Sequence, residues 1–252
     1  MFAVTELATS DWPIFVLTLH NDDERRRPLL SALDDAGVPY RLFMGVDGRR
    51  QLPGEYETLV DREAGFIRNG RQMTDGELAC ALSHRQIYAH ISESGLPGAI
   101  ILEDDAVLQP GFADFIHAGE YKHLPMVLIG FSYGRALPFR RIPVAGGELR
   151  RAAVQATMAA GYSLSATVAR KLYAANTPVS HPADWPASLY DLGAWLMVPR
   201  LVTHLDQGQC PSHLERQRSA SMAGKSRCAP QSLAERLRRR ISIRVGRAKG
   251  QR

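Results

Sequence analysis

Three consecutive carboxylates directly follow an apolar segment, and they are the clearest sign of chemistry in this sequence. Ala99–Leu102 is wholly apolar, and Glu103, Asp104 and Asp105 come next. Carboxylates this close raise one another's pKa unless a cation neutralises them. If a strand continues through the triplet, Glu103 and Asp105 project to the same side. Two such oxygen ligands suit a hard ion such as Mn²⁺ or Mg²⁺, which can stabilise a diphosphate leaving group.

The triplet alone leaves two other interpretations open. It is compatible with a solvated acidic turn at the end of a strand. It is also compatible with a Mg²⁺ phosphotransferase site, but such a site usually includes a glycine loop that cradles phosphate, and this sequence has none.

A helix with a polar stripe is predicted before the triplet, over residues 74–94. Thr74 is a suitable N-cap, and Glu77 three residues later completes a capping box. Glu77, Cys80 and either Ser83 or His84 then share one stripe of the helix, which indicates a lined cleft. The alternative is structural, with Cys80 packed in the core and His84 bonded to a buried partner.

The surrounding segments predict an α/β fold that brings these residues together. Residues 14–19, 40–44, 99–102 and 127–130 read as buried strands, and a helix over 24–36 ends at Gly37. Strand, helix and strand within a short span indicate a βαβ unit. A hairpin that turns at Gly146-Gly147, a helix over 168–175 and a strand over 198–202 complete the pattern. In open α/β sheets, ligands bind at the carboxyl ends of strands.

Three phrases in order resemble glycosyltransferase family 25, the lipopolysaccharide and lipooligosaccharide biosynthesis glycosyltransferases. They are FMGVDG at residues 43–48, MTDGELACALSH at 73–84 and ILEDDAV at 101–107. Weaker matches follow at GYSLS, residues 161–165, and at PADW, residues 182–185. The resemblance covers residues 13–205. The family tends to have an arginine in the first loop where this chain has Asn21, whereas Arg25 matches the second arginine of that loop.

The resemblance implies a GT-A-like fold, a Rossmann-type sandwich with a mixed, mostly parallel central sheet. It implies transfer of a sugar, with galactose favoured, from a UDP-sugar to a lipopolysaccharide or other glycan acceptor, with inversion at the anomeric carbon. The acidic triplet would be the family's DxD-type motif and would bind Mn²⁺ or Mg²⁺ through Glu103 and Asp105. The predicted donor-binding residues are Arg25, Ser83, His84 and Asp104.

A carboxylate must also take the proton from the acceptor hydroxyl. Asp184 is the preferred candidate for this base, and Glu77 and Asp75 are its rivals. For Asp184, the alternative is a loop residue that caps the segment after Pro182. His204 or Asp206, after the predicted strand 198–202, could supply a third metal ligand. A structural role is the alternative for both and is the more common one at such a place.

Composition and charge bound the remaining possibilities. The 252 residues suit one sizeable domain, and three scattered cysteines favour a reducing compartment over a disulfide framework. The start of the chain does not resemble a secretory signal, and no apolar run is long enough to span a bilayer. These features predict a cytoplasmic protein.

The net charge of +5 divides unevenly along the chain. Residues 225–252 hold ten Lys or Arg and one acid, a net charge of +9, so residues 1–224 carry −4. We therefore predict a transferase domain over 1–224 and a basic tail over 225–252. Apolar residues at intervals of four, flanked by arginine, predict an amphipathic helix on an anionic membrane, at the inner face of the cytoplasmic membrane. A disordered basic tail is the alternative.

Two other function classes remain to be weighed. One is a non-catalytic protein that binds a nucleotide-sugar or carbohydrate on a transferase-like fold, which the intact Glu103 and Asp105 argue against. The other is a nucleic-acid-binding protein, which rests on the tail alone. The negative charge of residues 1–224 argues against it, and no specific nucleic acid is predicted as a partner.

Overall fold

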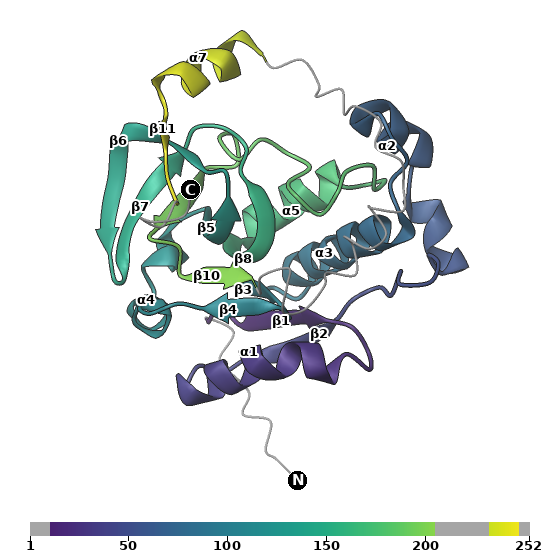
Figure 1. Cartoon of the computed structure of the whole chain (residues 1–252), viewed down its shortest axis with the longest axis horizontal. Helices are drawn as coiled ribbons and strands as arrows, with labels where there is room; N and C mark the ends of the chain where they lie inside the picture. Colours follow the sequence, from purple (N-terminus) through teal and green to yellow (C-terminus); the bar gives the residue numbers. More distant parts are fainter. Residues whose placement is uncertain (1–10, 205–231, 247–252) are drawn as a thin grey trace.

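A computed structural model describes residues 11–204 and 232–246 and has an α/β architecture built on one large sheet (Figure 1). The nine strands of this sheet follow the order β11-β6-β7-β9-β5-β8-β3-β1-β2, and β4 and β10 form a separate two-stranded sheet. No described helix is long and apolar enough to cross a membrane.

The half of the sheet nearest the N-terminus is parallel. β1 (Ile14–Thr18) lies between β2 (Arg41–Met44) and β3 (Gly98–Glu103) and pairs in parallel with both. The chain passes from β1 to the β2 side and then returns to the β3 side, so β1 marks a point where the winding direction reverses. The carboxyl ends of strands at such a point usually form the ligand crevice of an open α/β sheet.

Helices cover both faces of this half, as the alternation of buried residues requires. On one face, Val16 packs in a cluster with Leu29 and Leu33 of α1 (Asp23–Asp35). On the other face, Leu17 packs in a cluster with Ile87 of α3 (Asp75–Glu93), and α5 (Ala166–Ala175) joins the same cluster. The β1 side chains alternate between two apolar layers, which makes this strand a rigid support for residues at its carboxyl end.

The other half of the sheet is mainly antiparallel. β8 pairs antiparallel with both β3 and β5, and β7 pairs antiparallel with β6 and β9, whereas β5 and β9 are parallel. Its strands are β5 (Met126–Ser132), β6 (Arg135–Val144), β7 (Gly147–Ala152), β8 (Thr157–Ser165) and β9 (Ala194–Val198).

Shorter elements lie around the sheet. They are η1 (Gly54–Leu59), α2 (Arg62–Asn69), β4 (Ala106–Leu108), α4 (Phe112–Ala118), η2 (Glu120–His123) and β10 (Val202–His204). β10 pairs antiparallel with β4, which places the segment after β9 beside the segment that follows the acidic triplet.

The predicted α/β fold with a mixed central sheet is confirmed. Three of the eight strand pairings of this sheet are parallel, two of them at β1, and the other five are antiparallel. The hairpin turning at Gly146 is also confirmed, as β6 and β7. The predicted strand over 198–202 is wrong in its bounds, because β9 ends at Val198 and β10 begins only at Val202. Pro199 follows Val198 directly and has no N–H to donate to a strand partner, which explains the break.

Part of the basic tail folds back onto the sheet. α7 (Leu233–Ile241) has the predicted helical conformation, but the helix ends before Val245, the last apolar residue of the predicted stripe, and Val245 packs against the core. β11 (Ile243–Arg244) extends the sheet edge by pairing antiparallel with β6. Arg135 of β6 holds the junction by donating hydrogen bonds to the Ser242 hydroxyl at 2.8 Å and to its carbonyl at 2.7 Å. The boundary predicted between residues 224 and 225 lies outside the described residues.

Candidate active site

A cavity of about 160 Å³ opens at the carboxyl ends of the three parallel strands. Thr18 ends β1, Gly45 follows β2 and Glu103 ends β3, and all three residues line the cavity. Arg25 of α1 and Cys80 of α3 line it from the two helical layers. This is the position at which the winding reversal predicts a ligand crevice.

Asp104 and Asp105 share one arginine. Arg25 donates from Nε to Asp104 Oδ1 at 2.7 Å and from Nη2 to Asp105 Oδ2 at 2.5 Å. The Thr18 hydroxyl donates to the other Asp104 oxygen at 2.8 Å. Among the described residues, Arg25 is therefore the cation that partly neutralises Asp104 and Asp105, two of the three carboxylates of the triplet.

Glu103 has a different partner, on the opposite side of the sheet from Arg25. Nε2 of His84, on α3, lies 3.2 Å from Glu103 Oε1, and the His84 ring is 1% exposed. Burial alone would raise the pKa of Glu103. The hydrogen bond and charge of His84, with the charges of Arg25 and His204, nevertheless hold this pKa below its ordinary value.

The expectation that strand alternation would set Glu103 and Asp105 side by side is only partly met. β3 ends at Glu103, and a turn at Asp104 and Asp105 connects it to β4, so the alternation does not extend to Asp105. The two carboxylates still affect each other, because the charge of Glu103 helps to raise the pKa of Asp105.

Asp105 is a buried carboxylate whose charge its neighbours only partly balance. Burial, followed by the charge of Glu103, raises the pKa of Asp105 to about 6, although Arg25 acts in the opposite direction. Its Oδ1 atom is buried and has no hydrogen-bond partner among the described residues. A divalent ion bound to Oδ1 would satisfy this orphaned oxygen, so the acidic triplet fits Mn²⁺ or Mg²⁺ chemically.

The polar stripe predicted on α3 divides into three environments. Ser83 lines the cavity, but its hydroxyl donates to the Ala79 carbonyl at 2.7 Å and accepts from the Val46 N–H at 2.8 Å, so it braces the loop after β2. Cys80 lines the cavity. His84 lies behind Glu103 and does not line the cavity, and its Nδ1 is 2.7 Å from the Tyr162 hydroxyl.

Both rivals for the catalytic base are engaged in structural contacts. Glu77 is 1% exposed, forms the predicted capping box with Thr74 and receives Nη1 and Nη2 of Arg71 at 2.7 and 2.6 Å. Asp75 accepts from the Leu52 N–H and pairs with Arg62 at 2.9 Å. These contacts favour a structural role for both carboxylates, and neither lines the cavity.

Asp184 lies in the half-buried loop between α5 and β9. Its Oδ1 accepts the N–H of Met158 at 2.8 Å, a residue whose backbone has a positive φ of 75°. Asp184 is close enough to Tyr88 to contribute to the raised pKa of that phenol. The structure does not bring Asp184 into the wall of the cavity, so its catalytic role stays a prediction.

His204 lies beside the triplet, and its role as a third metal ligand stays a prediction. It pairs with Ala106 in the β10–β4 ladder, and its charge lowers the pKa of both Glu103 and Asp105. Asp206, the alternative ligand, lies outside the described residues.

Sequence reasoning missed three residues of this region. Arg49 lines the cavity and donates to both carboxylate oxygens of Asp47 and to the His20 carbonyl. Tyr162 belongs to one phrase of the family resemblance, and it also holds His84 from β8. Thr18 lies within the predicted strand 14–19, and its hydroxyl donates to Asp104. The pairing of Tyr162 with His84 spans 78 residues, and no local pattern could reveal it.

The loop after β2 approaches α3 too closely at position 48 for any residue with a Cβ atom, so a glycine is needed there. A Cβ atom there would lie 2.4 Å from the Asp75 carbonyl oxygen and 2.6 Å from the Ala79 side chain. The loop therefore packs directly against the first turn of α3, and this contact fixes the cavity wall next to Arg49.

Comparisons with known proteins identify a family and several relatives of this chain. The family described as glycosyltransferase family 25 (LPS biosynthesis protein) matches residues 11–186. The chain is 30% identical over 168 residues to the Bos taurus protein named probable inactive glycosyltransferase 25 family member 3, over 64% of this chain and 28% of that protein. It is 30% identical over 95 residues to procollagen galactosyltransferase 1 of Danio rerio, over 36% of this chain and 16% of that protein.

The chain spans less than a third of the length of these curated relatives. It also shares a distant likeness of shape, with a TM-score of 0.41 and 9% identity, with the solved structure of A197 from STIV, over 77% of this chain and 86% of that one.

The family match covers residues 11–186 and includes the whole cavity wall described above. The chain therefore belongs to glycosyltransferase family 25.

Proposed function

We propose that this chain transfers a sugar from a UDP-sugar to a glycan acceptor. The observation that carries the proposal is the acidic triplet at the carboxyl ends of three parallel strands, with one buried Asp105 oxygen that lacks a hydrogen-bond partner. A cavity that lies beside a cluster of carboxylates and is also lined by Arg25 suits a diphosphate and its counter-ion.

Mn²⁺ or Mg²⁺ would be held by Asp105 and Glu103, with His204 as a candidate third ligand. When bound, such an ion would offset the charge that develops on the departing diphosphate. The raised pKa of Asp105 supports this assignment, since it reports a carboxylate whose charge Arg25 only partly neutralises.

Arg25 would serve as the mobile cation of the donor site. Its guanidinium now bridges Asp104 and Asp105, and its side chain is 14% exposed. A metal ion at Asp105 would release one of its two contacts, and the guanidinium would then be available to a diphosphate oxygen. Asp104 would keep Arg25 in place through the second contact.

The acceptor hydroxyl would lose its proton to a carboxylate as it attacks the anomeric carbon. Asp184 is proposed as this base on the family resemblance, and Glu77 is the weaker candidate because Arg71 already occupies its carboxylate. Galactose is the favoured sugar, in line with the name of the Danio rerio relative, and a lipopolysaccharide or other lipid-linked glycan is the favoured acceptor. Inversion at the anomeric carbon is the proposed outcome.

Replacement of Arg25 tests the donor site. We expect Arg25→Ala to weaken UDP binding in the presence of Mn²⁺ by about tenfold or more, because a charge-assisted contact to phosphate contributes roughly 1.5–3 kcal/mol. Isothermal titration calorimetry measures the effect. Arg27→Ala is the matched control, since Arg27 lies on the same helix but is exposed. Equal UDP affinity in both variants would remove Arg25 from the donor site.

A second candidate function is retained because of the relatives' names. Several similar proteins are named inactive, including one from Homo sapiens that is 30% identical over 102 residues. A non-catalytic protein of this family would bind a nucleotide-sugar or carbohydrate without releasing UDP. Release of UDP on mixing with donor and acceptor therefore separates the two candidates.

We also propose that α7 attaches the protein to an anionic membrane surface, at the inner face of the cytoplasmic membrane. The apolar stripe of the helix faces away from the protein, with exposed fractions of 82% for Leu233, 61% for Leu237 and 55% for Ile241. Arg238 on another side of α7 anchors the helix by stacking on Tyr190 at 4.0 Å and donating to the Ala153 carbonyl. The other arginines of α7 are exposed, which favours anionic lipid headgroups.

The apolar stripe of α7 has a direct test. We expect the double change Leu237→Asp with Ile241→Asp to reduce co-sedimentation with vesicles rich in phosphatidylglycerol by at least about tenfold, because two apolar side chains no longer enter the lipid. Ile67→Asp is the control, since Ile67 is 70% exposed but lies on α2. Unchanged sedimentation of the double variant would exclude α7 as the membrane contact.

A further inference from the structure

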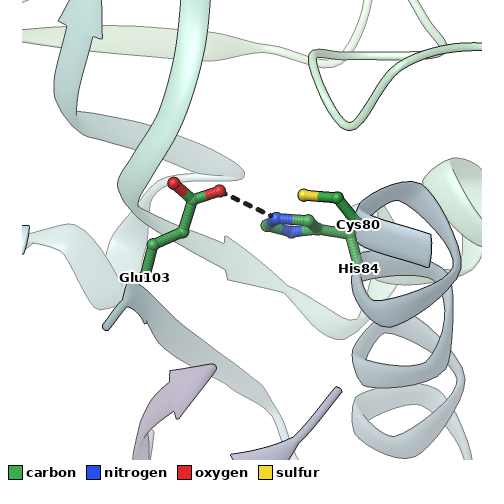
Figure 2. A group of neighbouring side chains, drawn as sticks. All are labelled: Cys80, His84 and Glu103. Atoms are coloured by element: carbon green, nitrogen blue, oxygen red, sulfur yellow. Dashed lines mark hydrogen bonds and ion pairs between the residues drawn. The ribbon is translucent and has the colours of Figure 1, made fainter. Parts of the chain in front are cut away.

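Cys80, His84 and Glu103 converge on one point beside the cavity. Cys80 and His84 are four residues apart on α3, so they share one face of the helix, and Glu103 approaches them from the end of β3 (Figure 2). One ligand atom from each residue lies within 4.8 Å of the others, and His84 Nε2 is 3.2 Å from Glu103 Oε1.

These separations are close to those of a tetrahedral metal site. Zinc binds sulfur at about 2.3 Å and imidazole nitrogen or carboxylate oxygen at about 2.0–2.2 Å, so ligand atoms in such a site lie about 3.3–3.8 Å apart. The His84–Glu103 pair, at 3.2 Å, lies close to this spacing, and the Cys80 sulfur lies within 4.8 Å of both partner atoms. Cys80 and Glu103 line the cavity, which supplies an entry path for the ion.

The surroundings of His84 fix the ring in the orientation that a metal ligand needs. The Tyr162 hydroxyl donates to Tyr88 at 3.2 Å, so the Tyr162 oxygen can accept from Nδ1–H of His84 at 2.7 Å. When an ion takes the place of the Nε2 proton that is bonded to Glu103, Nδ1–H still donates to Tyr162, and Nε2 offers its lone pair to the ion. Such outer contacts are typical of histidines that bind metal.

We propose that Cys80, His84 and Glu103 form a binding site for a zinc-class divalent ion, distinct in ligand chemistry from the Mn²⁺ or Mg²⁺ site at Asp105. A thiolate and an imidazole select borderline ions such as Zn²⁺ and Co²⁺, whereas carboxylates alone suit Mn²⁺ and Mg²⁺. Three protein ligands leave a fourth position that opens toward the cavity. Because Glu103 takes part in both sites, zinc at Cys80 and His84 competes with Mn²⁺ for this carboxylate.

Cobalt provides the sharpest probe of the site. The purified full chain without donor or acceptor is titrated with Co²⁺, and we expect a near-ultraviolet thiolate-to-cobalt charge-transfer band at one ion per chain, which excess Zn²⁺ abolishes. The band should disappear in Cys80→Ser. The matched control is Cys210→Ser with Cys228→Ser, which removes the two other cysteines of the chain and should keep the band.

Two further measurements, of zinc affinity and of Cys80 alkylation, test the same site. Tyr162→Phe should weaken zinc binding by about tenfold or more, because it removes the outer contact of His84. If Cys80→Ser does not fold, zinc should protect Cys80 of the wild-type chain against alkylation, as read by peptide mass. No band in the wild-type chain, a band that survives in Cys80→Ser, or alkylation unaffected by zinc would overturn the site. None of these readouts requires sugar transfer, so their failure would not bear on the proposed function.

Discussion

Asp105→Asn is expected to reduce metal-dependent UDP release by about 100-fold or more. The change keeps the shape of the side chain but replaces a charged metal ligand next to the developing negative charge, where loss of one stabilising group typically costs two to three orders of magnitude. UDP release with a saturating UDP-sugar and Mn²⁺ measures the effect. Asp114→Asn is the control, because Asp114 is an exposed acid on α4, away from the cavity wall.

The same variant is expected to fold at least as stably as the wild-type chain at pH 7 without metal. A carboxyl whose pKa is raised on folding, here to about 6, favours the folded state while protonated and opposes it once ionised. The free energy of unfolding therefore falls as the pH rises from the unfolded pKa of Asp105 through about 6, where the folded carboxyl ionises. Asparagine carries no charge at any of these pH values, so this loss of stability does not occur in the variant. Activity lost together with a large loss of stability would show that Asp105 is structural.

Glu77→Ala is expected to lower the free energy of unfolding by about 3 kcal/mol. The change removes one half of the capping box of α3 and leaves the Arg71 guanidinium without its carboxylate, and loss of one partner of a buried pair typically costs about 3–5 kcal/mol. Urea denaturation followed by circular dichroism measures it. Partial exposure of Arg71, at 23%, places the expectation at the low end of this range.

The control for Glu77 lies on the same helix. Glu93→Ala removes an exposed glutamate at the last residue of α3 and should change stability by less than about 0.5 kcal/mol. If Glu77→Ala instead abolished sugar transfer while it left stability intact, Glu77 would return as a candidate base and the structural interpretation of its contacts would be wrong.

Local patterns were sufficient to predict the part of the fold that carries the site. The apolar run of β1, the capping box at Thr74 and the apolar run of β3 are each encoded within a few residues, and all three are confirmed. The antiparallel half was less readable, because β8 pairs with β3 across more than 50 residues and nothing local specifies that partner. The break at Pro199 shows that one residue without an N–H is enough to divide an apolar run into two strands.

The acidic triplet was predictable, but the partners of its members were not. Strand periodicity suggested that Glu103 and Asp105 would act as a pair, whereas the turn after β3 directs Asp104 and Asp105 to Arg25 and Glu103 to His84. These contacts join α1, β3 and α3, so they depend on how the helical layers pack on the sheet. A motif therefore identifies the residues of such a site, while the tertiary structure decides how their charges are distributed.

The central claim, that this chain is a metal-dependent transferase, is tested most directly by UDP release. The purified chain is incubated with a panel of UDP-sugars and a glycan acceptor, with Mn²⁺ and then with EDTA. We predict release from one sugar, with UDP-galactose favoured, and loss of that release with EDTA. Binding of UDP without release from any donor would support the non-catalytic alternative. Release that continues unchanged in EDTA would contradict the role of the acidic triplet as a metal site.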